Sequence, residues 1–210
     1  MPGQTFTTFL DHAQGQYGYL TPDDARDLGV DPVQLRLMAA RGTIDHLGHG
    51  LYRMREVPPT ELDPYMEAVL WTGRRGVLSH ETALDLYDLC DVNPAAIHLI
   101  VPKGFRTRKE TPPTYRLHYA DLTPDEVRLH EGIPIVTAEL AILGGIEQGL
   151  GWQLIDQAVK NARARGLITR QVAARLGNRQ VEARIARRVG SGAQTPPITA
   201  RRTNRSQLHG

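Results

Sequence analysis

Few side chains in this sequence have the types and the spacing that metal or acid–base chemistry requires. His80-Glu81 resembles the first half of the HExxH helix of zinc proteases, but Leu84 stands where the second histidine is needed. His98, His118 and His130 lie in predicted strands and could converge as metal ligands, although histidines scattered in this way are more often packed or surface residues. We therefore expect neither a bound metal ion nor a cofactor.

The sequence also shows no nucleotide-binding loop and no activated nucleophile. Gly144-Gly145 lacks the GxGxxG and GxxxxGK spacings, and Gly48-His49-Gly50 has the composition of a turn. Cys90 has no basic neighbour and is predicted to be a core thiol. A Mg²⁺-dependent nuclease needs carboxylates and a lysine at strand ends, whereas no acid stands beside Pro102-Lys103. These patterns predict a binding protein rather than an enzyme, with a DNA-guided metal nuclease as the enzymatic alternative.

Length and composition indicate a globular protein of one or two domains. The chain has 210 residues, of which 40% are hydrophobic and 23% charged. No run approaches the roughly 18 apolar residues of a membrane span, and the N-terminus lacks the pattern of a signal peptide. The single cysteine excludes an internal disulfide and fits a reducing compartment. We expect a cytoplasmic protein.

The first 57 residues carry the signals of a winged helix. A short helix is predicted over residues 5–14. Thr21-Pro22-Asp23-Asp24 has the hydroxyl cap, proline and carboxylate of a helix start, and Asp31-Pro32-Val33-Gln34 repeats that signal. Two short helices joined by a tight turn are the outline of a helix-turn-helix. The stretch RGTIDHLGHGLYRM (41–54) then predicts a β-hairpin, which serves as the wing.

The second helix of such a unit lies in the major groove of DNA, with its N-terminal residues at the base edges. There Gln34 could read adenine, and Arg36 could read guanine or hold a phosphate. The hairpin would lie beside the groove, with His46 near the DNA backbone or the minor groove. The expected DNA contacts are Thr21, Gln34, Arg36, Arg41, His49 and Arg53.

The charge distribution argues partly against strong DNA binding by this unit alone. Residues 1–57 hold five arginines and seven acids, a net charge of −2, and phosphate neutralisation supplies most non-specific affinity. From residue 170 onward there are nine arginines and only Glu182 as an acid, a net charge of +8. The basic end is either a solvated tail or the contact for an anionic partner.

Pro58-Pro59 marks a boundary, after which helix and strand signals alternate. Gly177-Asn178 separates two apolar faces and predicts a break between two short C-terminal helices. The sequence thus predicts an α+β fold with a winged helix-turn-helix at 1–57, a mixed α/β domain with a small sheet and flanking helices at 61–189, and a basic flexible tail at 190–210. The predicted strands are 97–101, 115–119, 127–130 and 133–136.

Several residues of the first domain resemble the winged helix of the AbiEi-family antitoxins. They are Gly18-Tyr19-Leu20-Thr21, Ala25, Gly29-Val30, Leu35, Met38, Gly42, Ile44, Gly50 and Tyr52. The segment from Leu78 to Leu84, the strand Ile97–Val101 and the turn Glu131-Gly132-Ile133-Pro134-Ile135 resemble the second half of that family. The resemblance covers most of residues 15–175, and the basic tail lies outside it.

The resemblance implies an antitoxin of a bacterial toxin–antitoxin system. Its winged helix would bind inverted or direct repeats of operator DNA, with a homodimer on the DNA as one arrangement, and repress the operon. Its second domain would counteract a nucleotidyltransferase-like toxin of the AbiEii type. The arginines expected to contact the toxin, or to assist as basic residues, are Arg170, Arg175, Arg179, Arg184, Arg187 and Arg188. A free-standing transcription regulator with a dimerising or ligand-sensing second domain is the alternative.

Overall fold

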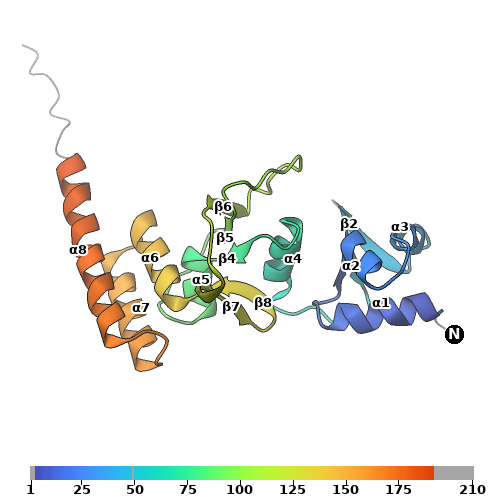
Figure 1. The fold of residues 1–210 in the computed structure, drawn as a ribbon, viewed down its shortest axis with the longest axis horizontal. Helices are drawn as coiled ribbons and strands as arrows, with labels where there is room; N and C mark the ends of the chain where they lie inside the picture. Colours follow the sequence, from blue (N-terminus) through green and yellow to red (C-terminus); the bar gives the residue numbers. More distant parts are fainter. Residues whose placement is uncertain (1–2, 49, 192–210) are drawn as a thin grey trace, which may run out of the picture.

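The computed structural model describes residues 3–48 and 50–191, without the side chains of 185 and 187–191. The chain is elongated, with the N-terminal helices and hairpin at one end, a five-stranded sheet in the middle and three helices at the other end (Figure 1). The predicted 190–210 tail falls almost entirely outside the described residues. No helix in the described ranges is long and apolar enough to cross a membrane.

The N-terminal unit is the winged helix that the sequence predicts. Its strands form an antiparallel sheet in the order β1-β3-β2. Thr21 and Asp24 form a reciprocal capping box at the start of α2, as the sequence pattern indicates. The elements are α1 (Gln4–Gln14), β1 (Tyr19–Leu20), α2 (Pro22–Asp27), α3 (Val33–Ala40), β2 (Ile44–Gly48) and β3 (Leu51–Met54).

A small hydrophobic core holds these elements together. The fully buried side chains Phe9, Leu20, Leu35, Ile44 and Met54 come from α1, β1, α3, β2 and β3 respectively. α3 and β2 each bury one face in this core, so their opposite faces stay free for other contacts, whereas both residues of β1 and three of the four residues of β3 are buried.

The second part of the chain is a mixed sheet with helices packed on it, which confirms the predicted α+β class. The strand order is β6-β5-β4-β8-β7, with β5–β6 and β4–β8 parallel and the other pairs antiparallel. The elements are α4 (Asp63–Trp71), β4 (Val77–Leu78), α5 (His80–Leu86), β5 (Ile97–Val101), β6 (Tyr115–Tyr119), η1 (Pro124–Glu126), β7 (Val127–His130), β8 (Ile133–Val136) and α6 (Ala138–Gln148).

The C-terminal helices correct one prediction. After α7 (Trp152–Ala164), residues Arg170–Ser191 form a single helix, α8, rather than two short helices broken at Gly177-Asn178. A glycine inside a helix costs about 1 kcal/mol relative to alanine. Tertiary packing outweighs that cost, because Leu176 is buried in the main core and the Gln180 amide donates to the Trp152 carbonyl at 3.0 Å.

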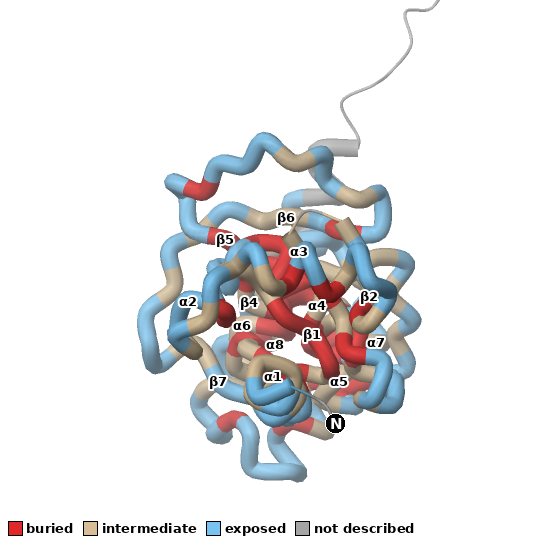
Figure 2. The backbone as a smooth tube through the Cα atoms, turned by 90° about the vertical axis from the view of Figure 1, so that its right-hand side faces the viewer, coloured by how far each residue is buried: buried red, intermediate tan, exposed pale blue. Residues whose placement is uncertain are grey.

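The main core continues from the sheet into the winged helix. It is built around fully buried side chains of β4, α5, β5, β8 and α6, and it also includes Tyr19 of β1 and Leu51 of β3. Figure 2 shows the buried segments in red running through the centre of the molecule, including β1 and α4. The wing strand β3 therefore packs on both hydrophobic cores.

Candidate nucleic-acid interface

The exposed face of α3 is the surface that a helix-turn-helix presents to DNA. Leu35 and Met38 point into the core, whereas Val33, Arg36 and Leu37 are exposed. This division follows from the 3.6-residue period of the helix, which places residues one or two positions away from a buried side chain on the outer face.

Two arginines on this face have no partner among the described residues. No hydrogen bond or ion pair is formed by the side chains of Arg36 or Arg41, within the part of the chain that the structure describes. Gln34 is half-buried at the edge of a groove between α3 and the start of α1, where Arg41 also lies. The structure thus brings Gln34 and Arg41 to one groove, whereas Arg36 lies with Val33 and Leu37 on the exposed side of α3.

Arg53 occupies a different environment from the expected one. Its guanidinium donates to the Asp63 carboxylate at the start of α4, with a distance of 2.8 Å between Nη2 and Oδ2, and both side chains are largely buried. The guanidinium also lies 5.9 Å from the centroid of the Tyr19 ring. Because this ion pair joins the wing to the second part of the chain, we revise the expectation that Arg53 contacts DNA.

The rest of the wing offers few free cations. Arg55 forms two hydrogen bonds to the Asp45 carboxylate, at 2.8 and 2.5 Å, and this contact lowers the pKa of Asp45. The His46 ring stacks on Tyr52 with 4.7 Å between ring centroids. His49, expected at the tip, lies outside the described residues.

Thr21 has a structural role at the start of α2. Its hydroxyl donates to Asp24 Oδ2 at 2.7 Å and accepts from the Asp24 backbone N–H. Both hydrogen-bonding functions of the hydroxyl are therefore used within the capping box. We revise the expectation that Thr21 contacts DNA for this reason.

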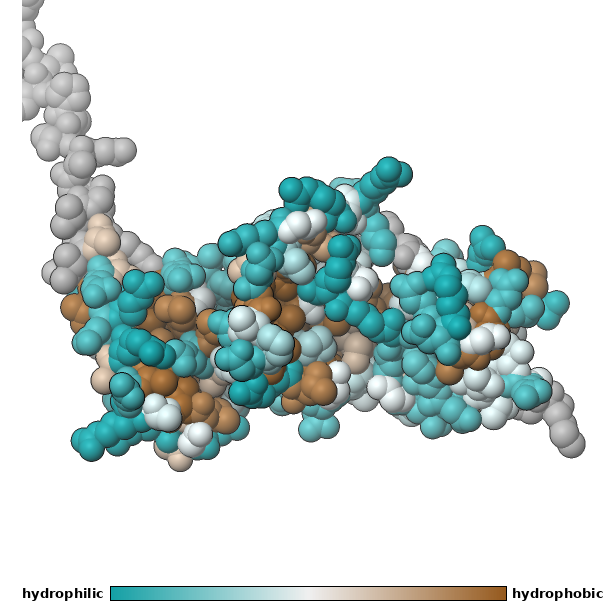
Figure 3. All heavy atoms as spheres, viewed as in Figure 1, coloured by the Kyte–Doolittle hydropathy of each residue, from teal (hydrophilic) through white to brown (hydrophobic). Residues whose placement is uncertain are grey.

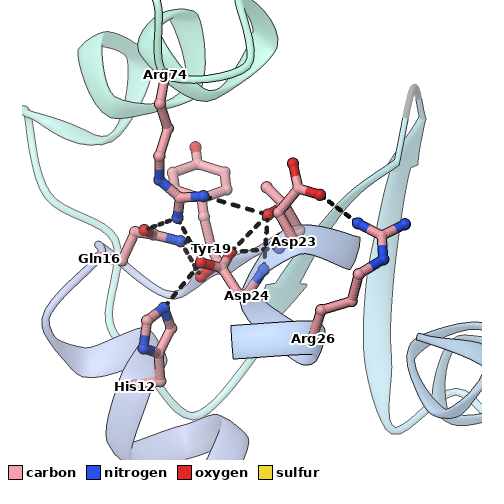
Figure 4. A network of polar contacts seen from close by, with 8 residues as sticks. His12, Gln16, Tyr19, Asp23, Asp24, Arg26 and Arg74 are labelled. Atoms are coloured by element: carbon pink, nitrogen blue, oxygen red, sulfur yellow. Dashed lines mark hydrogen bonds and ion pairs between the residues drawn. The ribbon is translucent and has the colours of Figure 1, made fainter. Parts of the chain in front are cut away.

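Asp24 is the centre of a buried polar network that reaches the second part of the chain (Figure 4). Its side chain is 2% exposed, and its carboxylate contacts His12 Nε2 at 3.0 Å, the Gln16 amide at 3.1 Å and Arg74 Nη2 at 2.5 Å. Arg74 also donates to the Gln16 side-chain carbonyl. Burial alone would raise the pKa of Asp24, but the hydrogen bonds from Thr21 and Gln16 and the Arg74 charge lower it.

Sequence reasoning missed a basic loop that lies beside the wing. Residues 103–109 (KGFRTRK), here called the basic loop, contain four cations and no acid. The loop projects toward the tip of the β2–β3 hairpin (Figure 1), and its Lys109 lines a cavity of about 450 Å³ together with Leu47, Gly48 and Gly50 of the wing. The four cations were visible in the sequence, but their position beside the wing depends on long-range packing.

Two of the four cations in the basic loop form hydrogen bonds within the protein. Arg106 donates to the carbonyls of Phe105 and Lys103, at 2.8 and 3.2 Å. The Lys109 ammonium donates to the Trp71 carbonyl at 3.3 Å, and burial lowers its pKa. Lys103 and Arg108 are exposed, and among the described residues their side chains have no partner.

The C-terminal arginines are distributed along α8 at the opposite end of the molecule. Arg175 pairs with Glu139 of α6, Arg179 lies 3.8 Å from Glu182, and the Arg184 guanidinium lies 6.0 Å from the Trp152 ring centroid. Arg170 is exposed at the start of α8. The side chains of Arg187 and Arg188 lie outside the described part of the chain.

Hydrophobic side chains are exposed near these arginines. Trp152 of α7 is 52% exposed and Val181 of α8 is 57% exposed. Figure 3 shows hydrophobic residues over the C-terminal helices at its left side, whereas hydrophilic side chains project at the top, around the basic loop. The C-terminal helices and the surroundings of the basic loop thus present surfaces of different chemistry.

Cys90 is not an activated nucleophile. Cys90 is buried, and burial raises the pKa of its thiol to about 11. A thiol with such a pKa is almost entirely protonated at neutral pH and is a poor nucleophile. The arrangement around α3 and the basic loop is that of a binding surface.

Comparisons with known proteins agree with this geometry. Residues 10–55 match the model of a family described as transcriptional regulator, AbiEi antitoxin. Among solved structures, the chain is similar to the crystal structure of the RV2827C protein from Mycobacterium tuberculosis, with a TM-score of 0.50 and 16% identity over 93% of this chain and 84% of that one. At this identity the similarity concerns the fold. No curated protein matches the chain. The family model thus covers the winged helix, and this part of the chain is similar to the AbiEi antitoxin family of transcriptional regulators.

Proposed function

We propose that this protein is an antitoxin that represses its own operon by binding operator DNA and counteracts a nucleotidyltransferase-like toxin of the AbiEii type. The observation that carries the DNA-binding part is the exposed face of α3, with the unpaired cations Arg36 and Arg41, in a winged helix of the AbiEi type. In this proposal α3 enters the major groove, where Gln34 contacts a base edge and the two arginines hold phosphates or guanine.

The basic loop completes this surface. The winged helix alone has a net charge of −2, and three of its five arginines, Arg26, Arg53 and Arg55, are in ion pairs with Asp23, Asp63 and Asp45 respectively. Lys103 and Arg108 supply free positive charge beside the wing, from the second part of the chain. The proposal therefore assigns phosphate contacts to α3 and to the basic loop together.

Salt dependence of DNA binding tests this assignment. Each phosphate contact contributes about −0.9 to the slope of log K against log salt concentration. With contacts from α3 alone the slope is about −2 per bound chain, and with Lys103 and Arg108 added it is about −4. Fluorescence anisotropy on the DNA upstream of the gene, at several salt concentrations, gives this slope for the wild type.

Matched variants separate the two contributions. Arg36→Ala combined with Arg41→Ala is expected to lower affinity and to weaken the sequence preference that Gln34 still supplies, whereas Lys103→Ala combined with Arg108→Ala lowers affinity on all DNA and makes the slope less negative by about 2. Arg163→Ala combined with Arg170→Ala, two exposed residues of α7 and α8 far from α3, is the charge-matched control. Unchanged affinity and unchanged sequence preference in the α3 variant contradict the DNA-binding proposal.

The toxin contact is proposed at the opposite end of the molecule, on the outer faces of α7 and α8. Trp152 and Val181 are exposed there beside Arg184, and aromatic residues and arginines are enriched in protein interfaces. This surface favours direct contact with the toxin over an indirect effect.

Co-expression with the product of the neighbouring gene tests both the antitoxin activity and its location. Wild-type chain is expected to restore growth, and Val181→Asp is expected to lose this rescue and the toxin pull-down while keeping DNA binding. Leu129→Asp is the control, because Leu129 of β7 is 73% exposed in a different region. Absence of rescue by the wild type contradicts the antitoxin proposal.

A free-standing regulator with a ligand-sensing second domain is the alternative function. The cavity of about 450 Å³ between the wing and the second part of the chain favours it, because a ligand there would contact both. Trp71, whose indole N–H is buried without a hydrogen-bond partner among the described residues, lines this cavity. A gene neighbourhood without a nucleotidyltransferase-like protein would favour this alternative over the antitoxin.

A further inference from the structure

Three histidines from three different elements meet at the sheet of the second part of the chain. His80 begins α5 directly after β4, His98 lies on β5 and His118 lies on β6. One nitrogen of each ring lies within 4.8 Å of the others. Among the described residues, these three histidines therefore form a group that could hold a metal ion. His130, which the sequence analysis considered with His98 and His118, lies on β7 at the other edge of the sheet.

The register of β5 and β6 explains why two of the rings approach each other. In this parallel pair His98 is opposite Arg116 and His118 is opposite Ile100, so both histidines lie on the same face, offset by two residues. His98 Nδ1 and His118 Nε2 are 3.0 Å apart. Two nitrogens that bind one zinc ion at about 2.0–2.1 Å in tetrahedral geometry are separated by roughly 3.3 Å, so the separation of this pair is already close to the one that a shared ion requires.

The surroundings of His80 are built to hold its ring. His80 is buried and has a positive φ of 52°, a backbone conformation that non-glycine residues adopt rarely. Gly144 of α6 packs against it so closely that a Cβ there would lie 2.7 Å from His80 Cδ2. The Ser79 hydroxyl lies 2.9 Å from His80 Nδ1, which fixes one ring nitrogen and leaves Nε2 as the possible ligand atom.

The neutral form of an imidazole is the one that binds metal ions. Burial, together with the neighbouring His118 and His98, lowers the pKa of His80 to about 3. Burial and His98 lower the pKa of His118 to about 4, and burial and Arg116 lower the pKa of His98. Arg116 is the nearby cation that opposes a metal ion, but it is exposed to solvent, which screens its charge.

We propose that His80, His98 and His118 bind a divalent transition-metal ion of the Zn²⁺ class, with a fourth position open to water or a partner's side chain. Imidazole nitrogens suit Zn²⁺, Cu²⁺ and Ni²⁺, and three histidines with one open position form a known kind of zinc site. His98 and His118 are half-buried, so the ion reaches the site from solvent. The site has no part in the proposed DNA contacts.

Metal binding requires one change in the cluster. The His80 and His118 rings are stacked, with 3.7 Å between centroids and 16° between planes. An imidazole binds an ion in the plane of its ring, so these two rings must tilt out of the stack toward a common point. The proton shared between His98 and His118 moves to the outer nitrogen of its ring, and each ligand stays neutral.

Bound metal would connect three elements that otherwise contact through packing. His80 precedes α5, and His98 and His118 belong to the edge strand pair β5–β6 that carries the basic loop between its strands. An ion that binds only the folded state stabilises that state according to its concentration relative to Kd. The proposal therefore predicts a metal-dependent increase in Tm.

Competition for Zn²⁺ between the untagged full-length chain and a chromogenic chelator at pH 7.5 tests the site. We expect one Zn²⁺ per chain, and Co²⁺ in its place is expected to give the intense visible absorption of tetrahedral coordination. Loss of an outer hydrogen-bond partner typically weakens metal binding about 10- to 100-fold. Ser79→Ala should therefore weaken binding by about tenfold, and His98→Gln or His118→Gln by more than about 100-fold.

His130→Gln is the matched control, since it removes a histidine of the same sheet outside the cluster. Far-UV circular dichroism shows whether each variant folds, and Ser79→Ala supplies a mild variant because its hydroxyl makes no helix-capping hydrogen bond. Binding of Zn²⁺ that is lost in His118→Gln and kept in His130→Gln, with a Zn²⁺-dependent rise in Tm only in the latter, supports the site. Absent binding, or equal affinity in all variants, overturns it.

Discussion

Arg74 is predicted to hold the winged helix against the second part of the chain through the buried carboxylate of Asp24. Replacing Arg74 by alanine removes the guanidinium that contacts this carboxylate and leaves the His12 ring in place at 3.0 Å. Asp24 stays buried and keeps its hydrogen bonds from Thr21 and Gln16. The perturbation therefore tests the charge–charge contact without creating a large cavity.

The expected destabilisation follows from the burial of the two partners. Removing one partner of a fully buried ion pair costs about 3–5 kcal/mol, and exposed pairs contribute about 0–1 kcal/mol. Asp24 is 2% exposed but Arg74 is 39% exposed, so water replaces part of what the guanidinium supplies. We expect the free energy of unfolding to fall by about 1.5–3 kcal/mol, the range of a hydrogen bond to a charged group.

The pH dependence of the stability difference provides an independent test of this contact. The folded-state pKa of Asp24 is lowered, so its carboxylate contributes stability above its unfolded pKa of about 3.9, and this contribution is lost as the pH falls through the folded pKa. Without Arg74 the folded pKa is higher. The stability difference between wild type and variant is therefore largest at neutral pH and shrinks as Asp24 becomes protonated in acid.

Urea unfolding at pH 7 and in acid, followed by tryptophan fluorescence and circular dichroism, measures both effects. Arg26→Ala is the control, because Arg26 forms an exposed ion pair with Asp23 in the same helix. Its effect is expected to stay below about 1 kcal/mol. The reasoning is refuted if Arg74→Ala costs no more than Arg26→Ala, or if its cost is the same at both pH values.

Three further predictions concern other parts of the fold. Gly144→Ala is expected to lower the free energy of unfolding by about 1–3 kcal/mol in urea titrations, because the added Cβ would overlap the His80 ring. Its counterpart Gly177→Ala on α8 is expected to raise the free energy of unfolding by about 0.5–1 kcal/mol, because the added Cβ meets nothing within 4 Å. Cys90 is expected to react with a thiol reagent at pH 8 only after unfolding, since it is buried with a pKa of about 11. Arg53→Ala is expected to lower stability by about 1.5–3 kcal/mol in the same titrations while the salt slope of DNA binding stays unchanged.

The sequence was sufficient for the winged helix because its signals are local. The capping box at Thr21, the turn before α3 and the hairpin after it each depend on residues within a few positions. The strands of the second part were equally visible, since 97–101, 115–119, 127–130 and 133–136 are the observed β5, β6, β7 and β8. The strand β4 was not among the predicted strands, because it is too short to show a periodic pattern.

The interactions between distant segments were not predictable in the same way. The sequence predicts Arg53 to be a free cation of the wing, whereas in the structure it pairs with Asp63, ten residues later. The approach of His80 to His98 and His118 depends on strand register and on the space that Gly144 leaves. A phase break in α8 predicted two helices because the pattern gave no information on the packing of Leu176.

In the proposed function, the positions of the charged residues allow DNA binding and toxin binding by the same chain. Arg53 and Arg74 hold the winged helix and the second part of the chain together, and this junction sets the basic loop beside the wing. The proposed toxin surface on α7 and α8 lies at the other end of the elongated molecule (Figure 1). Because the two surfaces share no residue, one chain can hold both partners at once. A toxin that weakens repression would then have to act through the junction between the winged helix and the second part of the chain. We therefore expect variants of Arg74 to change the effect of bound toxin on DNA affinity more than they change the affinity for DNA or for toxin measured separately.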